Sequence, residues 1–251
     1  MNRFLELFIK GMPIGMSNTL PGISGGTIAL VLKIYDELVH SIKKIKLKFL
    51  IPVVLGAVAG VFLGSSIIIT LFESYPIFVT SFLLGLILAS AKVTFTEVES
   101  FDIYKIILGL AGFFIAFLYS KETGNVGNVN EISLIKYFAG GAIGSIAMIL
   151  PGISGGTILV MLGLYQSVLT AISSFNITII LAFGLGIGSG LLLFSWLLSY
   201  LLDNYRATLM AFLTGLIIGS TRSVIPAQFN LVAILGLLLG ITAILLLLRI
   251  E

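Results

Sequence analysis

The stretch PGISGGTI occurs twice in this chain, at residues 21–28 and again at residues 151–158. The two copies are 130 residues apart, and the same offset, with no gaps, aligns SFLLGLILAS at residues 81–90 with AFLTGLIIGS at residues 211–220. An offset that stays constant over such a distance is the signature of an internal duplication. The sequence therefore predicts a chain built from two homologous halves.

The composition of the chain places it in a lipid membrane. Hydrophobic residues make up 58% of the 251 residues and charged residues 10%, whereas charged residues make up about 25% of a soluble domain. This leaves too little polar surface to cover a soluble fold, which excludes a soluble enzyme, a nucleic-acid-binding protein and a disordered chain. The chain contains no Cys and one His, so it offers no thiolate or multi-histidine metal site. We therefore expect an integral membrane protein with no metal, no cofactor and no nucleic-acid partner.

Each half carries the same series of apolar segments, which predicts a single all-α membrane domain of two inverted-topology repeats. A transmembrane helix needs about 20 predominantly apolar residues, and we expect a re-entrant helical hairpin followed by three transmembrane helices in each half. The first repeat covers residues 1–120, with its hairpin at 4–40 and its spans at 51–72, 77–91 and 103–119. The second repeat covers residues 131–251, with its hairpin at 134–172 and its spans at 177–201, 207–221 and 229–248.

A re-entrant hairpin is favoured over two full crossings because of one lysine. If segment 25–40 were a helix crossing the whole membrane, Lys33 would lie near the midplane, at a cost of about 2.5–3.5 kcal/mol. A hairpin with its tip at residues 18–24 lets the stem of Lys33 reach the interface. Two fully spanning helices remain the alternative.

Charge placement indicates the orientation in the membrane. The loop at residues 41–50 contains four lysines, whereas its counterpart at residues 171–180 contains no charged residue. Because cytoplasmic loops are enriched in Lys and Arg, the lysine loop is expected in the cytoplasm. Each half has an odd number of crossings with either form of the hairpin, so the second half is inverted relative to the first. Both termini are then cytoplasmic.

The duplicated motif has the features of an anion-binding helix N-terminus. Pro21 ends the incoming helix, Gly22 allows a sharp reversal, and Ser24 is a suitable N-cap for the next helix. Backbone N–H groups at such a terminus, left uncovered by glycines, attract phosphate or carboxylate. In an inverted repeat the two tips meet near the midplane, where transporter sites lie. The residues expected to bind a substrate phosphate are Gly22, Ser24, Gly25, Gly26, Thr27, Gly152, Ser154, Gly155, Gly156 and Thr157.

Close helix packing is the alternative role for glycine in a membrane helix. By itself, packing does not explain a proline break with Ser and Thr at two matched tips, so an anion cradle is favoured there. We expect packing to explain the scattered glycines of the long segments, which are Gly56, Gly60, Gly184, Gly186, Gly188 and Gly190.

Several charged residues outside the tips are matched between the halves. Lys92 and Arg222 correspond, and each is expected either to extend to the interface or to collect phosphate on its own side of the membrane. Glu73 and Asp203 also correspond. They are expected to be loop acids, with ion coupling as the alternative. His40 is expected near the cytoplasmic interface.

The duplicated PGISGGT motif resembles the signature of a prokaryotic membrane family, and the resemblance covers essentially the whole chain. This family was long described as a domain of unknown function and is associated with polyprenyl-phosphate transport, the PopT type of undecaprenyl phosphate translocase. The resemblance implies a multi-pass protein of the cytoplasmic membrane whose partners are the bilayer and a polyprenyl-phosphate lipid. It also implies that undecaprenyl phosphate is translocated for recycling in cell-wall polymer synthesis.

Two other functions stay open on the residues alone. A transporter or channel for a small soluble anion would use the same helix-tip chemistry. A membrane enzyme acting on lipid phosphates is less favoured. Phosphoryl transfer usually needs a metal clamp or a positioned base, whereas this chain has no Cys nucleophile and no His pair, and acids are scarce within its expected membrane segments. We therefore expect no catalytic residues, and alternating access around a midplane phosphate site.

Overall fold

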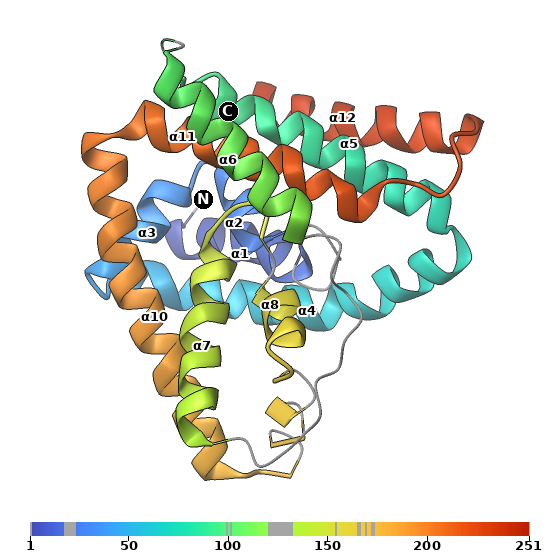
Figure 1. Ribbon diagram of the computed structural model, residues 1–251. Helices are drawn as coiled ribbons and strands as arrows, with labels where there is room; N and C mark the ends of the chain where they lie inside the picture. Colours follow the sequence, from blue (N-terminus) through green and yellow to red (C-terminus); the bar gives the residue numbers. More distant parts are fainter. Residues whose placement is uncertain are drawn as a thin grey trace.

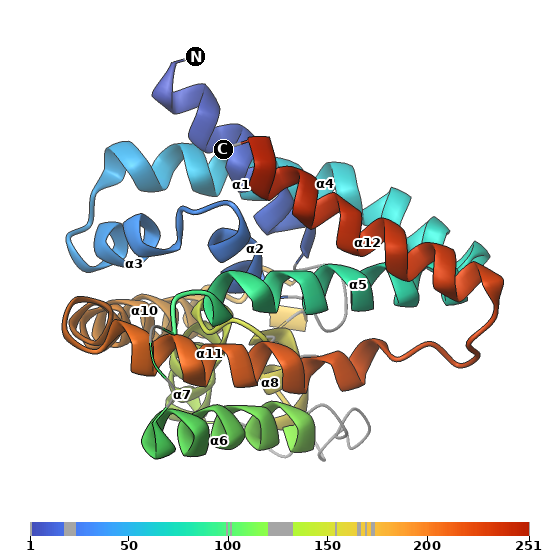
Figure 2. The same cartoon turned by 90° about the horizontal axis from the view of Figure 1, so that it is seen from above.

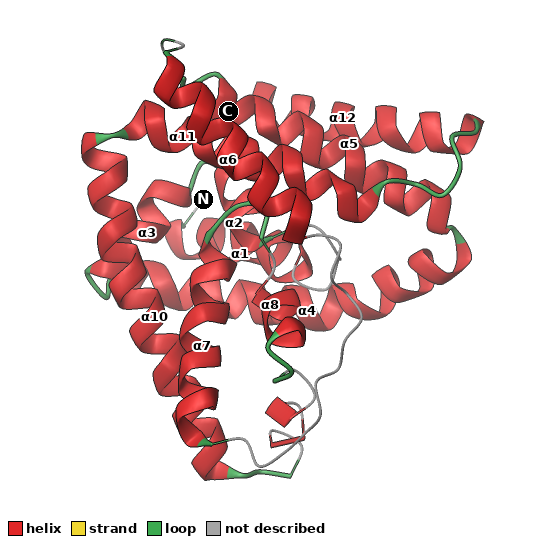
Figure 3. Cartoon of the chain, in the orientation of Figure 1, coloured by secondary structure: helices red, strands yellow, loops and turns green. Residues whose placement is uncertain are grey.

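The computed structural model describes residues 2–17, 24–98, 100, 102–119, 133–153, 155–164, 167–168, 170–171 and 174–250. Within these ranges every regular element is a helix and no strand occurs (Figure 3). The first part of the chain forms α1 (Arg3–Ser17), α2 (Gly25–Val31), α3 (Tyr35–Lys43), α4 (Leu47–Ser74), α5 (Pro76–Phe95) and α6 (Ile103–Tyr119). The second part forms α7 (Leu134–Ile149), α8 (Gly155–Met161), α10 (Ile177–Asn204), α11 (Arg206–Ser220), the 3₁₀ helix η1 (Thr221–Val224) and α12 (Leu231–Ile250).

Helix bounds follow the offset seen in the sequence. The short helices α2 and α8 begin at Gly25 and Gly155, and the long helices α4 and α10 begin at Leu47 and Ile177, each pair 130 residues apart. Both long helices are 28 residues long. The duplicated sequence therefore folds into a duplicated series of helices.

Glycines bring the first helix of each series close to the long helix. A Cβ atom added to Gly56 of α4 would overlap the carbonyl oxygen of Phe8 in α1. In the second series, a Cβ atom on Gly186 of α10 would overlap the carbonyl oxygen of Phe138 in α7. Gly60 and Gly190 make equivalent approaches, which confirms a packing role for these four glycines.

Two of the scattered glycines do not have the expected packing role. A Cβ atom on Gly184 or on Gly188 would meet nothing within 4 Å. Both glycines face away from the helix contacts of α10 because they alternate with the packed positions Gly186 and Gly190 along the helix. The expectation of close packing at these two positions was wrong.

The last helices are exchanged between the two series. Helix α5 packs against α12, and α11 packs against α6, so each contact joins helices from different halves. A Cβ atom on Gly85 of α5 would overlap the Leu237 carbonyl oxygen of α12, and one on Gly215 of α11 would overlap the Gly109 carbonyl oxygen of α6. Figure 2 shows α12, α5, α11 and α6 lying side by side in this order. The halves are therefore interlocked rather than separately folded.

The lengths of several helices and their exposed apolar side chains are compatible with a membrane protein. Among the described residues, three segments could cross a bilayer by length and composition: Pro76–Phe95, Ile177–Asn204 and Arg206–Val224, which contain α5, α10 and α11 of Figure 1. A fourth span is added if α3 and residues Leu47–Leu63, which meet at 119°, count as one. Large apolar side chains cover the exterior, with Leu193 and Trp196 of α10 exposed at 74% and 66% of their surface. Exposed apolar area on this scale indicates a lipid surrounding, as the composition predicts.

The spans expected at 77–91 and 207–221 lie within longer helices. Helix α5 has 20 residues, and α11 is followed directly by η1, which ends at Val224. The first half also lacks a continuous helix over 25–40. Helix α2 ends at Val31, and α3 begins at Tyr35.

The break between α2 and α3 is a Schellman motif. The N–H of Ile34 donates to the Ala29 carbonyl at 3.0 Å, and the N–H of Lys33 donates to the Leu30 carbonyl at 3.0 Å. Lys33 takes the left-handed conformation, with φ of 53°, that this helix ending requires. The matching residue of the second half is Gly163, with φ of 67°. The same turn therefore occurs in both halves, once with the preferred glycine and once with a lysine.

Candidate functional site

The two copies of the duplicated motif contact each other through hydrogen bonds. Ser24 caps α2, and its Oγ accepts the N–H of Thr27 at 3.3 Å. The same hydroxyl donates to the Leu150 carbonyl at 3.1 Å. In return, the Gly152 N–H donates to Ser24 Oγ at 3.1 Å and to Thr27 Oγ1 at 3.0 Å. These groups are buried, so two motifs far apart in the sequence form one polar contact inside the protein.

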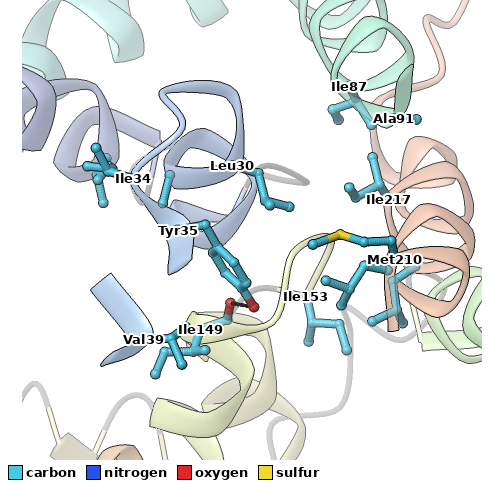
Figure 4. Packing of buried hydrophobic residues seen from close by; sticks show 14 of the residues in the cluster. Leu30, Ile34, Tyr35, Val39, Ile87, Ala91, Ile149, Ile153, Met210 and Ile217 are labelled. Atoms are coloured by element: carbon cyan, nitrogen blue, oxygen red, sulfur yellow. Dashed lines mark hydrogen bonds between the residues drawn. The ribbon is translucent and has the colours of Figure 1, made fainter. Parts of the chain in front are cut away.

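Close backbone approach reinforces this contact. A Cβ atom on Gly26 would overlap the Ile149 carbonyl oxygen. That carbonyl also accepts the hydroxyl of Tyr35 at 3.3 Å, shown by the dashed line in Figure 4. Gly152 has φ of 81°, and a Cβ atom there would lie 2.6 Å from the Leu216 carbonyl oxygen. Gly26 is thus required for the packing of one tip on the other, and Gly152 for the packing of the second tip on α11.

The structure brings together part of the expected phosphate-binding set. Ser24, Gly25, Gly26, Thr27, Gly152 and Gly155 are buried, whereas Gly156 is exposed. Gly22 and Ser154 lie outside the described residues, as does the side chain of Thr157. The Ser24 and Thr27 hydroxyls and the Gly152 N–H are bonded to each other. In this conformation protein groups therefore occupy three of the groups expected to bind phosphate, which are the Ser24 hydroxyl, the Thr27 hydroxyl and the Gly152 N–H.

Gly155 has a further packing contact. A Cβ atom there would lie 2.6 Å from the Gly144 carbonyl oxygen of α7 and 2.5 Å from Met148 Cγ. The start of α8 thus packs against α7, the helix that leads to the second tip.

A second polar region lies beside α3 and the end of α5. A cavity of about 420 Å³ is lined by the charged residues Lys33, Asp36, Lys92, Glu97 and Arg206, together with Leu30, Tyr35, Val93 and Thr96. Arg206 forms an ion pair with Asp36 through Nη1, and its Nε donates to Glu97 Oε2 at 2.6 Å. We call these three residues the Arg206 clasp. Sequence reasoning missed it, because the position matching Arg206 in the first half is Pro76.

The other charged residues are distributed around the molecule. Lys92 is exposed and lines the cavity of the Arg206 clasp. Arg222 donates from Nη1 to the Phe117 carbonyl at 2.9 Å, and its guanidinium lies 4.2 Å from the centre of the Phe117 ring. Neither residue takes part in the hydrogen bonds between the tips. A phosphate-collecting role for Lys92 and Arg222 therefore stays a prediction. Arg222 also has a structural role through its contacts with Phe117.

The acids proposed for ion coupling are partly described. Asp203 Oδ1 lies 3.2 Å from His40 Nε2, which joins α10 to α3. The side chain of Glu73 lies outside the described part of the chain. Among the described residues, no group of three or more His, Cys, Asp or Glu side chains could hold a metal ion.

Comparison with known proteins agrees with the resemblance carried by the motif. A curated polyprenyl-phosphate transporter of Vibrio cholerae is 35% identical over 243 residues, covering 89% of this chain and 78% of its own length. A curated polyprenyl-phosphate transporter of Staphylococcus aureus is 30% identical over 243 residues, covering 87% of this chain and 85% of its own length. No solved structure matches the chain. The model of the VCA0040-like family, described as undecaprenyl phosphate translocase-like, matches residues 14–235, and the chain belongs to this family.

Proposed function

We propose that this protein translocates undecaprenyl phosphate across the cytoplasmic membrane, for recycling in cell-wall polymer synthesis, without changing it chemically. Support comes from the family and from its two relatives named as polyprenyl-phosphate transporters. The observation that carries the proposal is the buried contact between the two duplicated tips, made by Ser24, Thr27 and Gly152. Burying polar groups in an apolar protein costs free energy. Polar groups from the two copies of one motif that contact each other are therefore suited to a shared substrate site.

In this proposal the present conformation is one in which the tips are closed on each other. Parting them would free two hydroxyls and the Gly152 N–H at the same place, and these are donors suited to a phosphate headgroup. The phosphate-binding groups would be those expected from both motifs. Movement of the halves against each other would present the site alternately to the two leaflets, as in other transporters with inverted repeats.

The proposed topology follows from the charge distribution. The repeats at residues 1–120 and 131–251 would have inverted orientations within one membrane domain, each beginning with a re-entrant hairpin. The lysine loop at residues 41–50 and both termini would face the cytoplasm. Matched helix bounds and matched glycine contacts support two equivalent repeats.

An apolar groove favours a lipid substrate over a small soluble anion. A groove of about 280 Å³ lies between α6 and α11 and is lined mainly by apolar side chains, among them Phe95, Phe113 and Ile218. An anion alone has no use for such a surface, whereas a prenyl chain can pack against it through van der Waals contacts in place of the surrounding lipid tails. A transporter or channel for a small anion is the alternative.

Reconstitution tests the proposal directly. Proteoliposomes containing the purified protein and labelled undecaprenyl phosphate would be scored for movement between leaflets and for chemical change of the lipid. We expect translocation of intact lipid. Flux of a small anion without lipid movement would support the alternative, and a new lipid product would show an enzyme instead.

A matched pair of variants links this assay to the tips. Gly26→Val places a side chain on the Ile149 carbonyl, whereas Gly184→Val places the same side chain in open space. Translocation should fall in the first variant and stay at the wild-type level in the second.

A further inference from the structure

The Arg206 clasp joins the two halves of the protein. Arg206 begins α11, in the second half, whereas Asp36 lies in α3 and Glu97 follows α5, both in the first half. Each carboxylate contacts a different nitrogen of the same guanidinium. The clasp therefore fixes two helices of one half to one helix of the other.

The clasp has no counterpart elsewhere in the repeat. At the offset of 130 residues, Asp36 corresponds to Gln166, Glu97 to Ala227 and Arg206 to Pro76. None of these three residues carries a charge, so the matching place in the other half offers no such ion pairs. A device present once in a duplicated chain distinguishes one face of the protein from the other.

The cavity beside the clasp has an excess of positive charge. Lys33 and Lys92 line it together with the clasp, which gives three cationic side chains against two carboxylates. Arg206, Asp36 and Glu97 are each partly exposed, with 44%, 41% and 34% of the side-chain surface accessible. An incoming anion can therefore reach the guanidinium, whose planar donors match a phosphate as well as a carboxylate.

We propose that this cavity binds the phosphate monoester of the lipid substrate on the face that carries α3, and that the phosphate displaces Asp36 and Glu97 from Arg206. This rests on the proposed function. Lys33 and Lys92 supply the charge that lets a dianion compete with two carboxylates already in place. Loss of the ion pairs releases the start of α11 from α3 and from the segment that follows α5, so that binding the headgroup opens this face. The opposite face, which lacks the clasp, opens without this requirement.

Binding measurements on the full-length protein in nanodiscs test the site. Farnesyl phosphate is the probe, with farnesol and inorganic phosphate as companion ligands. We expect farnesyl phosphate to bind, inorganic phosphate to compete with it, and farnesol to do neither. Lys92→Gln should weaken binding of farnesyl phosphate about 5-fold or more, as expected for one coupled interaction. Lys48→Gln is the matched control, because it removes a lysine that lies outside the cavity, and should bind normally.

The clasp is tested by removing its acids. In the Asp36→Asn, Glu97→Gln double variant, Arg206 no longer has carboxylate partners, so farnesyl phosphate should bind about 5-fold more tightly or better. Spin labels at Lys44, the C-cap of α3, and at Thr208, a partly exposed residue in the first turn of α11, would report the separation of α3 from the start of α11. Farnesyl phosphate should lengthen this distance in the unmodified clasp, and the double variant should show the longer distance without ligand. Arg206→Lys, which keeps the charge and loses the planar fork, should bind more weakly.

Two results would overturn the inference. One is normal binding by Lys92→Gln and Arg206→Lys proteins that remain folded. The other is an unchanged spin-label distance when farnesyl phosphate is bound. Either result would leave the proposed function standing if the wild-type protein still translocates undecaprenyl phosphate. Absence of translocation by the wild-type protein would instead refute the proposed function itself.

Discussion

The hydroxyls of Ser24 and Thr27 share one buried donor, which makes their contributions to stability non-additive. Gly152 N–H donates to both oxygens, at 3.1 and 3.0 Å. Removing either hydroxyl leaves the N–H with one acceptor, so Thr27→Val should cost about 0.5–1.5 kcal/mol, the net value of a hydrogen bond. Ser24→Ala also removes a helix cap and the bond to the Leu150 carbonyl, and should cost about 1–2 kcal/mol.

The double variant should cost more than the sum of the single variants. With both oxygens gone, the buried Gly152 N–H loses its acceptors, and an unpaired buried group costs about 1–3 kcal/mol. Ser24 Oγ and Thr27 Oγ1 also bond each other at 3.2 Å, and each single variant already breaks this bond, which lowers the excess. We therefore expect a coupling of about 0.5–1.5 kcal/mol beyond additivity, within the range for residues that share a partner. Because about 1.4 kcal/mol is a factor of ten, this coupling alone should raise the population with parted tips by up to roughly tenfold, in addition to the increases caused by the single variants.

The assay is a double-mutant cycle on the apparent free energy of unfolding in detergent micelles. Ser195→Ala with Thr242→Val serves as the control cycle, because each of these hydroxyls bonds only carbonyl groups of its own helix. The control should be additive within about 0.5 kcal/mol. The same additivity for Ser24 and Thr27 would refute a shared donor, and with it the hydrogen-bonded contact between the tips.

Three further predictions concern topology, packing and Arg222. In this Cys-free chain, single cysteines at positions 45 and 175 should be labelled from opposite sides of the membrane, and labelling from one side would exclude an inverted repeat. Gly26→Ala should lower the apparent melting temperature, by an overpacking cost of about 1–3 kcal/mol, whereas Gly184→Ala should not lower it. Arg222→Lys should also lower the melting temperature, because lysine keeps the charge but loses the planar contact with Phe117. An unchanged melting temperature with slower lipid uptake from the outer face would indicate phosphate capture by Arg222 instead.

The contact between the tips gives the duplicated glycines a second role. Their N–H groups at helix N-termini are suited to binding an anion, and their small size allows one tip to pack on the other. The structure contains the packing contact between the tips at Gly26, whereas Gly152 packs against α11. Phosphate binding by the same groups requires the tips to part, so packing and binding would belong to two conformations of one site.

The break after α2 shows where sequence reasoning stopped short. Residues 25–40 contain good helix formers and no proline, so local propensity favours a continuous helix. The structure instead places Lys33 in a left-handed conformation, which lysine rarely adopts. The matching Gly163 was a usable signal, because glycine is preferred at this position of a helix ending. Comparing the two halves position by position would have found the turn.

The sequence by itself determined the class of the protein, its helical content, its duplication and its family. Composition and apolar segment length act along the chain, so they can be recognised before any contact is known. Tertiary structure alone decided the exchange of α6 and α12 between the halves, the partners of Ser24 and Thr27, and the Arg206 clasp. Each of these joins residues more than 100 positions apart. Such partners depend on which helix ends meet in space, and a repeat in the sequence does not reveal this. The Arg206 clasp was especially hard to predict, because Arg206 is aligned with an uncharged residue, Pro76, when the two halves are compared.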